Sequence, residues 1–375
     1  MQKQVAYRVF VGCVLGLFIT AGPLQAEDAA AAKLQRLRET TVEKGVLFLL
    51  NKGRAGDGSY SSSSGTGVTA LVTTALLRSG VSPKDPRVAK SLAHLRSFIQ
   101  KDGGIYPTGS LYRNYETCLA ILCFSEINKN GEYDAVLKHA DAFVKGIQWD
   151  ESEGTEKGDP SYGGAGYGKH KRPDLSNTSF LVEALKATGN GKDSEALQRA
   201  LTFVSRCQNL ESEQNTTPFA AKVQDGGFYY TPAAGGTSQA GKTANGGLRS
   251  YASMTYAGLK SMIYAGVGPD DKRVKAAFSW IQKHYDLKAN PGMGQSGLFY
   301  YYHTFAKALA AMGVDEIEDA DGTKHNWRAE LIRNLAQQQQ PDGSWVNKND
   351  RWLEGDSNLV TGYALLALSY CQPKP

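Results

Sequence analysis

The sequence lacks several features that would assign it to a class. Its N-terminal apolar run, residues 9–19, is too short to span a bilayer, which takes about 20 residues, and no later segment resembles a transmembrane helix. None of its five cysteines forms a metal-type Cys-x-x-Cys pair. The formal net charge of +5 is too small to indicate a nucleic-acid partner. We therefore expect no nucleic acid, no metal and no cofactor.

The N-terminus has the order of a secretory signal. Lys3 and Arg8 precede the apolar run, and Ala26 offers a small residue for cleavage before Glu27. We predict a signal peptide at residues 1–26, one domain over 27–375, and export to the periplasm or the extracellular space. Cleavage lowers the net charge from +5 to +3. An uncleaved N-terminal anchor is the alternative, and peripheral association with a membrane stays open.

Four cysteines lie beyond the predicted signal: Cys118, Cys123, Cys207 and Cys371. Export permits disulfides, but no spacing among the four demands one. We therefore expect four buried free thiols.

Gly-rich turns that end in an aromatic residue recur along the chain. Each is followed by a pattern with helical period, and repeats of this length indicate one structural unit copied several times. The six turns are residues 56–60, 101–106, 161–167, 224–229, 295–300 and 341–345.

Each unit is predicted to contain two helices. The first is nearly all apolar or small and is typical of a buried helix, whereas the second is amphipathic. The predicted first helices are 68–77, 115–127, 178–187, 254–264, 304–312 and 359–370, and the predicted second helices are 88–99, 133–147, 194–207, 272–284 and 327–339. A helix at 34–50 would supply the missing partner. The pattern predicts an all-α fold, a single closed α6–α6 toroid (α/α barrel), with an open solenoid as the rival.

Two long loops, 150–172 and 211–250, interrupt this regularity. Both are rich in Gly, Ser, Thr, Asn and Lys. Long loops in compact domains are commonly functional, and we expect these two to border a cavity mouth.

The turn with the sequence Gln-Gln-Gln-Gln-Pro-Asp-Gly-Ser-Trp (337–345) resembles the QW repeat of squalene–hopene cyclases, and the other five turns look like weaker copies. Over about residues 40 to 372 the chain resembles the terpenoid cyclase and protein prenyltransferase superfamily. The resemblance implies the toroid, structural roles for the turn aromatics Tyr60, Tyr106, Phe228 and Trp345, and a central ligand cavity lined by the starts of the inner helices.

The catalytic motifs of that superfamily are incomplete here. Residues 173–178 are similar to the acidic cyclase motif, and Asp174 is kept, but Ser176 and Asn177 stand where two further acids would be. Residues 302–304 resemble the context of the prenyltransferase zinc-binding histidine, yet the matching stretch at 251–253 offers Tyr and Ser. The resemblance therefore implies neither squalene cyclisation nor a zinc site.

Polar side chains near the inner-helix starts are the candidate site residues. Asp174 is the predicted acid, because a dry site raises the pKa of a carboxyl, with Tyr256 and His303 as orienting groups. We expect helix capping for Ser176, Asn177, Ser357 and Asn358. The predicted ligand-binding residues are Arg113, Glu116, Asn177, Tyr251, Tyr302, Lys307 and Asp356.

Three functions compete on these observations. The leading one is an exported toroid that binds, and in a divergent cyclase-like way transforms, an apolar isoprenoid-type ligand. A carbohydrate-active envelope enzyme would instead need two carboxylates facing each other across the cavity, such as Glu116 and Asp174. A non-catalytic interaction protein would use the long loops as its surface and fill the cavity with its own side chains.

Overall fold

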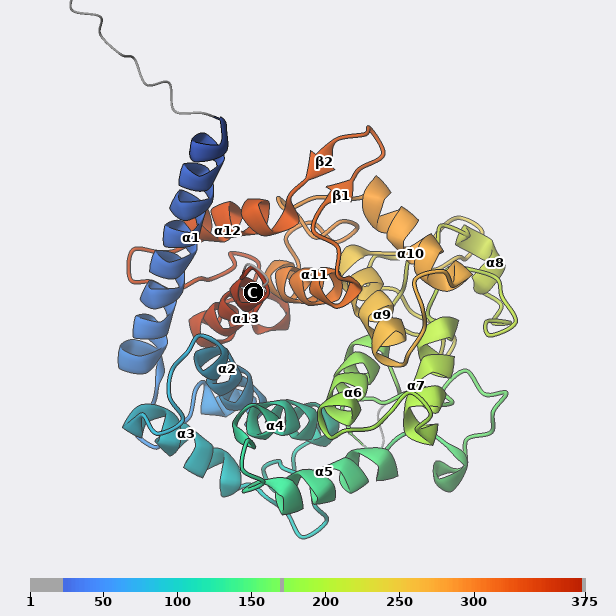
Figure 1. Ribbon diagram of the computed structural model, residues 1–375. Coiled ribbons are helices and arrows are strands. Elements are labelled where there is room, and N and C mark those ends of the chain that lie inside the picture. The colour runs from blue at the N-terminus through green and yellow to red at the C-terminus, as the bar shows by residue number, and fades with distance from the viewer. Residues whose placement is uncertain (1–22, 169–171, 373–375) are drawn as a thin grey trace, which may run out of the picture.

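The computed structural model describes residues 23–168 and 172–372, so the predicted signal lies almost wholly outside the described residues. Within them, two concentric rings of helices form a closed toroid (Figure 1). The inner ring comprises α2 (Gly67–Arg78), α4 (Arg113–Ile127), α6 (Leu175–Ala187), α9 (Ala252–Tyr264), α11 (Leu298–Met312) and α13 (Ser357–Ser369). The outer ring comprises α1 (Pro23–Phe48), α3 (Pro86–Arg96), α5 (Asp134–Gly146), α7 (Glu195–Arg206), α10 (Lys272–Lys283) and α12 (Trp327–Gln338).

The ring closes between its first and last inner helices. Each inner helix packs against the next, and α13 packs against both α11 and α2. The predicted outer partner is also confirmed, because α1 packs along α12 and α13. Arg38 on α1 donates from Nε to the carbonyl of Leu368 near the end of α13, at 3.0 Å. The all-α toroid is therefore confirmed and the open solenoid is excluded.

The two rings follow from the two kinds of helix pattern. In α13 every residue from Leu359 to Leu368 is buried, as expected for a helix apolar on all sides. In α7 the buried residues fall on one stripe that includes Leu197, Ala200 and Val204, while the remaining face is wet. Hydrophobic burial between the rings supplies most of the driving force for this arrangement.

The recurring turns pack against outer helices through their glycines. Gly343 has φ of +93°, and a Cβ there would lie 2.4 Å from the carbonyl oxygen of Lys44 on α1. Gly103 has φ of +89°, and its Cβ would lie 2.6 Å from the carbonyl oxygen of His139 on α5. Only glycine tolerates both the positive φ and the close approach, which explains the repeated Asp-Gly.

Polar side chains join neighbouring units. Gln208 donates to the carbonyl of Gly226 in its turn and to that of Arg273 on α10, both at 2.9 Å. Gln339 does the same to Gly343 and to Thr41 on α1. A threonine hydroxyl on the inner helix accepts the backbone N–H of the turn in five units, at Thr69, Thr117, Thr178, Thr255 and Thr361. The turn aromatics Tyr60, Tyr106, Phe228 and Trp345 are buried, as their structural role requires.

The fifth unit departs from the prediction. α11 begins at Leu298, six residues before the predicted start, so residues 295–300 form a helix start and not a turn like the others. The reason is a cap from far along the chain: Oε1 of Glu354 accepts the backbone N–H of Tyr300 at 2.8 Å. A distant cap of this kind leaves no local signal.

The remaining elements are short. The two long loops hold α8 (Ala220–Val223) and a 3₁₀ turn, Glu151–Glu153. A two-stranded antiparallel ribbon pairs β1 (Ile317–Glu318) with β2 (Lys324–His325), Ile317 facing His325. The four cysteines beyond residue 26 are buried free thiols, as predicted.

Candidate functional site

A cavity of about 460 Å³ opens at the end of the barrel where the inner helices begin. All six inner helices contribute residues from their first two turns, among them Val68, Tyr115 and Met254. The two long loops also border it, through Tyr167 from one and Tyr230 and Gln239 from the other. The cavity is therefore open and not filled by its own side chains.

Aromatic rings form most of its wall. The rings of Tyr300 and Tyr363 meet edge to face with centroids 5.8 Å apart. Tyr115 meets Phe180 in the same way at 5.2 Å and Tyr167 at 6.3 Å. Such contacts fix the rings in place and present apolar faces to a ligand.

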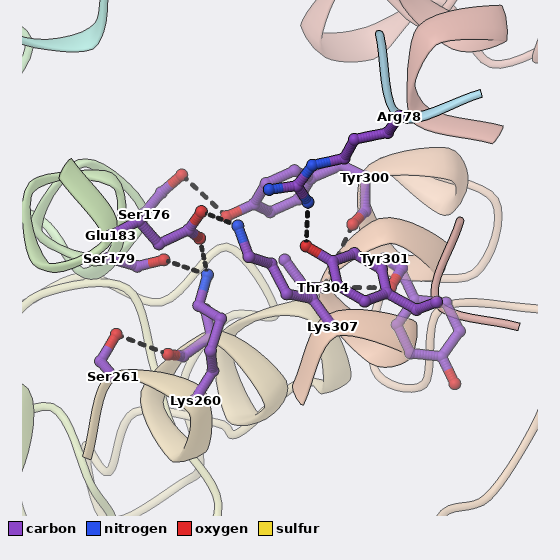
Figure 2. A network of polar contacts seen from close by, with 12 residues as sticks. Arg78, Ser176, Ser179, Glu183, Lys260, Ser261, Tyr300, Tyr301, Thr304 and Lys307 are labelled. Atoms are coloured by element: carbon purple, nitrogen blue, oxygen red, sulfur yellow. Dashed lines mark hydrogen bonds and ion pairs between the residues drawn. The ribbon is translucent and has the colours of Figure 1, made fainter. Parts of the chain in front are cut away.

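The hydroxyl groups in the wall are neutral hydrogen-bonding groups. Burial raises the pKa of Tyr115 to about 12, and it raises the pKa of Tyr300 and Tyr363 as well. Tyr300 and Ser176 share a hydrogen bond at 3.1 Å between their hydroxyl oxygens (Figure 2). The wall can orient a ligand through a few hydroxyls, and the described residues that line it include no Lys, Arg or His.

Glu354 is the one carboxylate among the described residues that line this cavity. Its Oε1 caps α11 at Tyr300, and its Oε2 accepts from the Asn347 side chain at 2.7 Å. Burial raises the pKa of Glu354 above its usual value. Because both oxygens are engaged, Glu354 is held in place by the fold and not aimed at a ligand.

The mouth of the cavity carries two apolar residues in an unusual backbone conformation. Trp352 and Leu353 have φ of 57° and 65° and are 44% and 52% exposed. The Arg351 guanidinium lies 4.2 Å from the Trp352 ring centroid and also donates to the Gln239 side chain at 2.7 Å. Non-glycine residues with positive φ cost energy and gather at ligand-binding segments.

The predicted acid, Asp174, lies beside this cavity but does not line it. It is the N-cap of α6: Oδ1 accepts the backbone N–H of Asn177 at 2.9 Å, and Oδ2 accepts from the Asn177 side chain at 2.8 Å. Burial raises the pKa of Asp174 to about 6. The capping prediction was wrong in detail, since Asp174 and Asp356 supply the caps and Ser176, Asn177, Ser357 and Asn358 lie in the first turns.

The two predicted orienting groups also lie outside the cavity. Tyr256 is buried in an aromatic cluster, with its ring 5.7 Å from Tyr301 and 5.1 Å from Phe305. His303 is buried deeper in the barrel, where burial holds its pKa well below the usual value. The structure therefore does not bring Asp174, Tyr256 and His303 together around one space, and their catalytic roles stay predictions.

The predicted ligand-binding residues are scattered. Tyr251 lines the cavity, whereas Lys307 faces a separate pocket at the other end of the barrel. Glu116 is buried and accepts from the backbone of Thr66 and the hydroxyl of Ser110.

The other four make structural contacts. Arg113 lies over the Tyr106 ring, and Tyr302 donates its hydroxyl to the carbonyl of Leu287 at 2.6 Å. Asp356 caps α13. Asn177 is paired with the capping Asp174.

Sequence reasoning missed most of the wall. Tyr115, Phe180 and Tyr363 fell within predicted inner helices and Tyr300 ended the fifth turn motif, but none of them was singled out as a site residue, and neither was Trp352. Tyr115, Phe180, Tyr300 and Tyr363 lie in the first two turns of four different inner helices, which was a usable signal because those starts converge in a toroid. Among the described residues, no three His, Cys, Asp or Glu side chains gather as a metal site. None of the described helices combines the length and the apolar character that crossing a membrane requires.

Comparisons with known proteins agree with the fold. Residues 55–231 match the sequence model of the squalene-hopene cyclase C-terminal domain, so this part of the chain is terpenoid cyclase-like, as the turn motifs predicted. Among curated proteins, none matches the chain.

Two solved structures share the toroid at low identity. A glycosyl hydrolase of family 88 from Bacteroides vulgatus is 12% identical with a TM-score of 0.52, over 91% of this chain and 98% of that one. A possible family 105 member from Salmonella enterica is also 12% identical with a TM-score of 0.52, over 90% and 93%. The type II terpene cyclase MstE from Scytonema, solved with geranylgeranyl dihydroxybenzoate, is 16% identical with a TM-score of 0.35, over 91% and 99%. At 12% identity, the likeness to the two proteins with a TM-score of 0.52 concerns the fold alone.

Proposed function

We propose that this protein binds an apolar, isoprenoid-type small molecule in the aromatic cavity. The observation that carries the proposal is the wall itself: an open space of about 460 Å³, lined mainly by aromatic and aliphatic side chains with a few neutral hydroxyls. Its volume falls within the range of about 300–1,000 Å³ typical of small-molecule sites. The match of residues 55–231 to a squalene-hopene cyclase domain supports an isoprenoid.

The carbohydrate alternative is weaker on the same geometry. Glycoside hydrolysis needs two carboxyl groups flanking the bond, about 5–10 Å apart. Of the carboxylates considered, Glu354 lines the cavity but caps a helix, while Asp174 and Glu116 are engaged in hydrogen bonds outside the lining. The shared fold of two glycosyl hydrolases keeps this alternative as an outcome of the test below.

Equilibrium dialysis with radiolabelled farnesol tests the proposal. We expect one saturable site per chain, and Ser176→Phe, which places a ring into the cavity beside Tyr300, to weaken binding at least about tenfold. Ser97→Phe, an exposed serine at the end of α3, is the matched control and should bind as the wild type does. Binding of cellobiose in place of farnesol, or farnesol binding that Ser176→Phe leaves intact, would overturn the proposal.

We also infer that the protein is exported, on the signal-like order of residues 1–26. N-terminal sequencing of the protein from its own cells tests this inference. A mature chain that starts at Glu27 is expected, and a cytoplasmic chain that retains Lys3 and Arg8 would contradict it.

A further inference from the structure

A second pocket, of about 500 Å³, opens at the other end of the barrel. The inner helices end there, and its lining comes from their last turns, including Arg78, Glu126, Lys186, Tyr264 and Tyr370. We call this space the polar pocket. The proposed function of the aromatic cavity does not use it.

Two buried lysines converge on one buried glutamate beside the polar pocket. Lys260 bonds to Oε1 of Glu183 and Lys307 bonds to Oε2 (Figure 2). Lys260, Lys307 and Glu183 are 1%, 5% and 2% exposed. Lys307 and Glu183 line the pocket, whereas Lys260 lies behind them and also donates to Ser179 at 2.9 Å.

These contacts leave a surplus of positive charge. Glu183 can neutralise one lysine, and Glu126 is engaged with Arg78, which also donates to Tyr370. Burial holds the pKa of neighbouring His303 well below its usual value, so the imidazole is uncharged near neutral pH. Exposed Lys186 at the rim adds a further cation. An uncompensated charge in a buried setting is costly unless a partner neutralises it.

The helix ends do not account for this surplus. Partial negative charge at a helix C-terminus favours cations in the last turn, and Arg78 and Lys186 occupy such positions. Lys260 and Lys307 lie before the last turns of α9 and α11, where the effect has decayed. Burial lowers the pKa of Lys260 and the charge of Lys307 lowers it further, whereas the contact with Glu183 raises it.

We propose that the polar pocket is a second ligand site, which takes a small oxyanion, a phosphate or a carboxylate, against Lys307 and Arg78. The oxyanion would neutralise the surplus charge through charge-assisted hydrogen bonds. A narrow space of about 20 Å³ lies on the barrel axis between the two sites, lined by Phe180 towards the aromatic cavity and by Lys307 and Arg78 towards the polar pocket. The oxyanion is therefore either a free ion or the head of an apolar chain that passes Phe180.

Thermal unfolding of the full chain in sodium phosphate, against sodium chloride at equal ionic strength, tests the site. A ligand that binds the folded state raises the melting temperature in a saturable way. We expect this rise for the wild type and a weakening of phosphate affinity by more than about tenfold in Lys307→Met. Lys307→Met leaves Glu183 balanced by Lys260, so the variant is expected to fold; Lys260→Met gives a second balanced variant. Lys101→Met, an exposed lysine in a turn, is the matched control and should respond as the wild type does.

A second arm separates the two sources of oxyanion. Farnesyl monophosphate is compared with farnesol in the wild type and in Lys307→Met. A preference for the phosphate that Lys307→Met abolishes supports the site with a lipid headgroup, even if inorganic phosphate fails to bind. Absence of any response to phosphate and of any preference for farnesyl monophosphate overturns the proposal, as does binding that neither lysine variant changes.

Discussion

The two ends of the barrel differ in what they present to its axis. At the end where the inner helices begin, tyrosines, Phe180 and Trp352 surround a cavity with neutral hydroxyls. At the end where they finish, Arg78, Lys307 and Glu183 line a charged pocket. One repeated unit builds both ends, so the repeat sets the scaffold, and the residues placed at either end of each inner helix set what the ends can bind.

The largest expected effect comes from removing the shared carboxylate at the charged end. Glu183→Gln leaves two buried ammonium groups without a counter-charge, and we expect a loss of about 3–5 kcal/mol in the free energy of unfolding. Glu354→Gln at the aromatic end keeps an oxygen to accept from Tyr300, so its loss should stay below about 2 kcal/mol. Urea denaturation measures both. Equal losses would show that the two carboxylates have the same role, contrary to the comparison.

The second largest expected effect is a difference between the two ends in how stability depends on pH. Burial raises the pKa of Asp174 to about 6, so between about pH 4 and 6 the unfolded chain releases this proton before the folded chain does. The contribution of Asp174 to the free energy of unfolding is therefore largest below about pH 4. It decreases as the pH rises to about 6 and is constant above that. For Glu183, burial acts to raise the pKa but the two lysines outweigh it and lower the pKa, so its stabilisation is lost as the solution becomes acidic.

Asp174→Asn removes the titrating carboxyl of Asp174 and keeps a side chain that can cap α6. Relative to the wild type, we expect the variant to gain about 3 kcal/mol in free energy of unfolding between pH 4 and pH 7. Urea denaturation at both pH values measures this gain, and Asp356→Asn is the matched control at another helix cap. A pH-independent difference between Asp174→Asn and the wild type would show that Asp174 is not the buried titrating group described here.

A smaller effect is expected at the mouth of the aromatic cavity. Trp352→Ala removes an apolar wall, and we expect farnesol affinity to fall about tenfold, or about 1.4 kcal/mol, with no change in the phosphate response of the polar pocket. Trp280→Phe, at an outer-ring tryptophan away from both sites, is the control. Isothermal titration calorimetry with farnesol gives the affinities, and a Trp352→Ala variant with unchanged affinity would place the apolar ligand elsewhere.

The smallest effect should come from a single hydroxyl in the wall. Tyr300→Phe removes the hydrogen bond to Ser176 and is expected to cost about 0.5–1.5 kcal/mol of stability, while farnesol still binds. Guanidinium denaturation measures the stability and dialysis the binding. Loss of farnesol binding in Tyr300→Phe would mean that the ligand is recognised by hydrogen bonding and not by apolar contact.

The sequence predicted the scaffold well because the scaffold is periodic. Apolar helices alternating with amphipathic ones, and Asp-Gly turns such as the one at Gly343, specified both rings and their closure. The start of α11 was wrong because its cap, Glu354, lies more than 50 residues further on. Local patterns cannot show a contact of that kind.

The candidate sites were far less predictable. Asp174 was found as a buried acid beside the cavity, but its engagement as a helix cap depends on where α6 begins. Glu183 and Lys260 were overlooked, although a charge inside an otherwise apolar helix was a visible signal. That they meet Lys307 from three different helices follows only from ring geometry, which single-helix patterns do not contain.

Native mass spectrometry of the mature protein purified from its own cells, with solvent extraction of whatever is bound, tests the central claim most directly. The account predicts an extractable apolar ligand, or the uptake of one farnesol by protein that arrives empty. Protein that stays at its apo mass when farnesol and squalene are offered would contradict the assignment of the aromatic cavity to an apolar ligand.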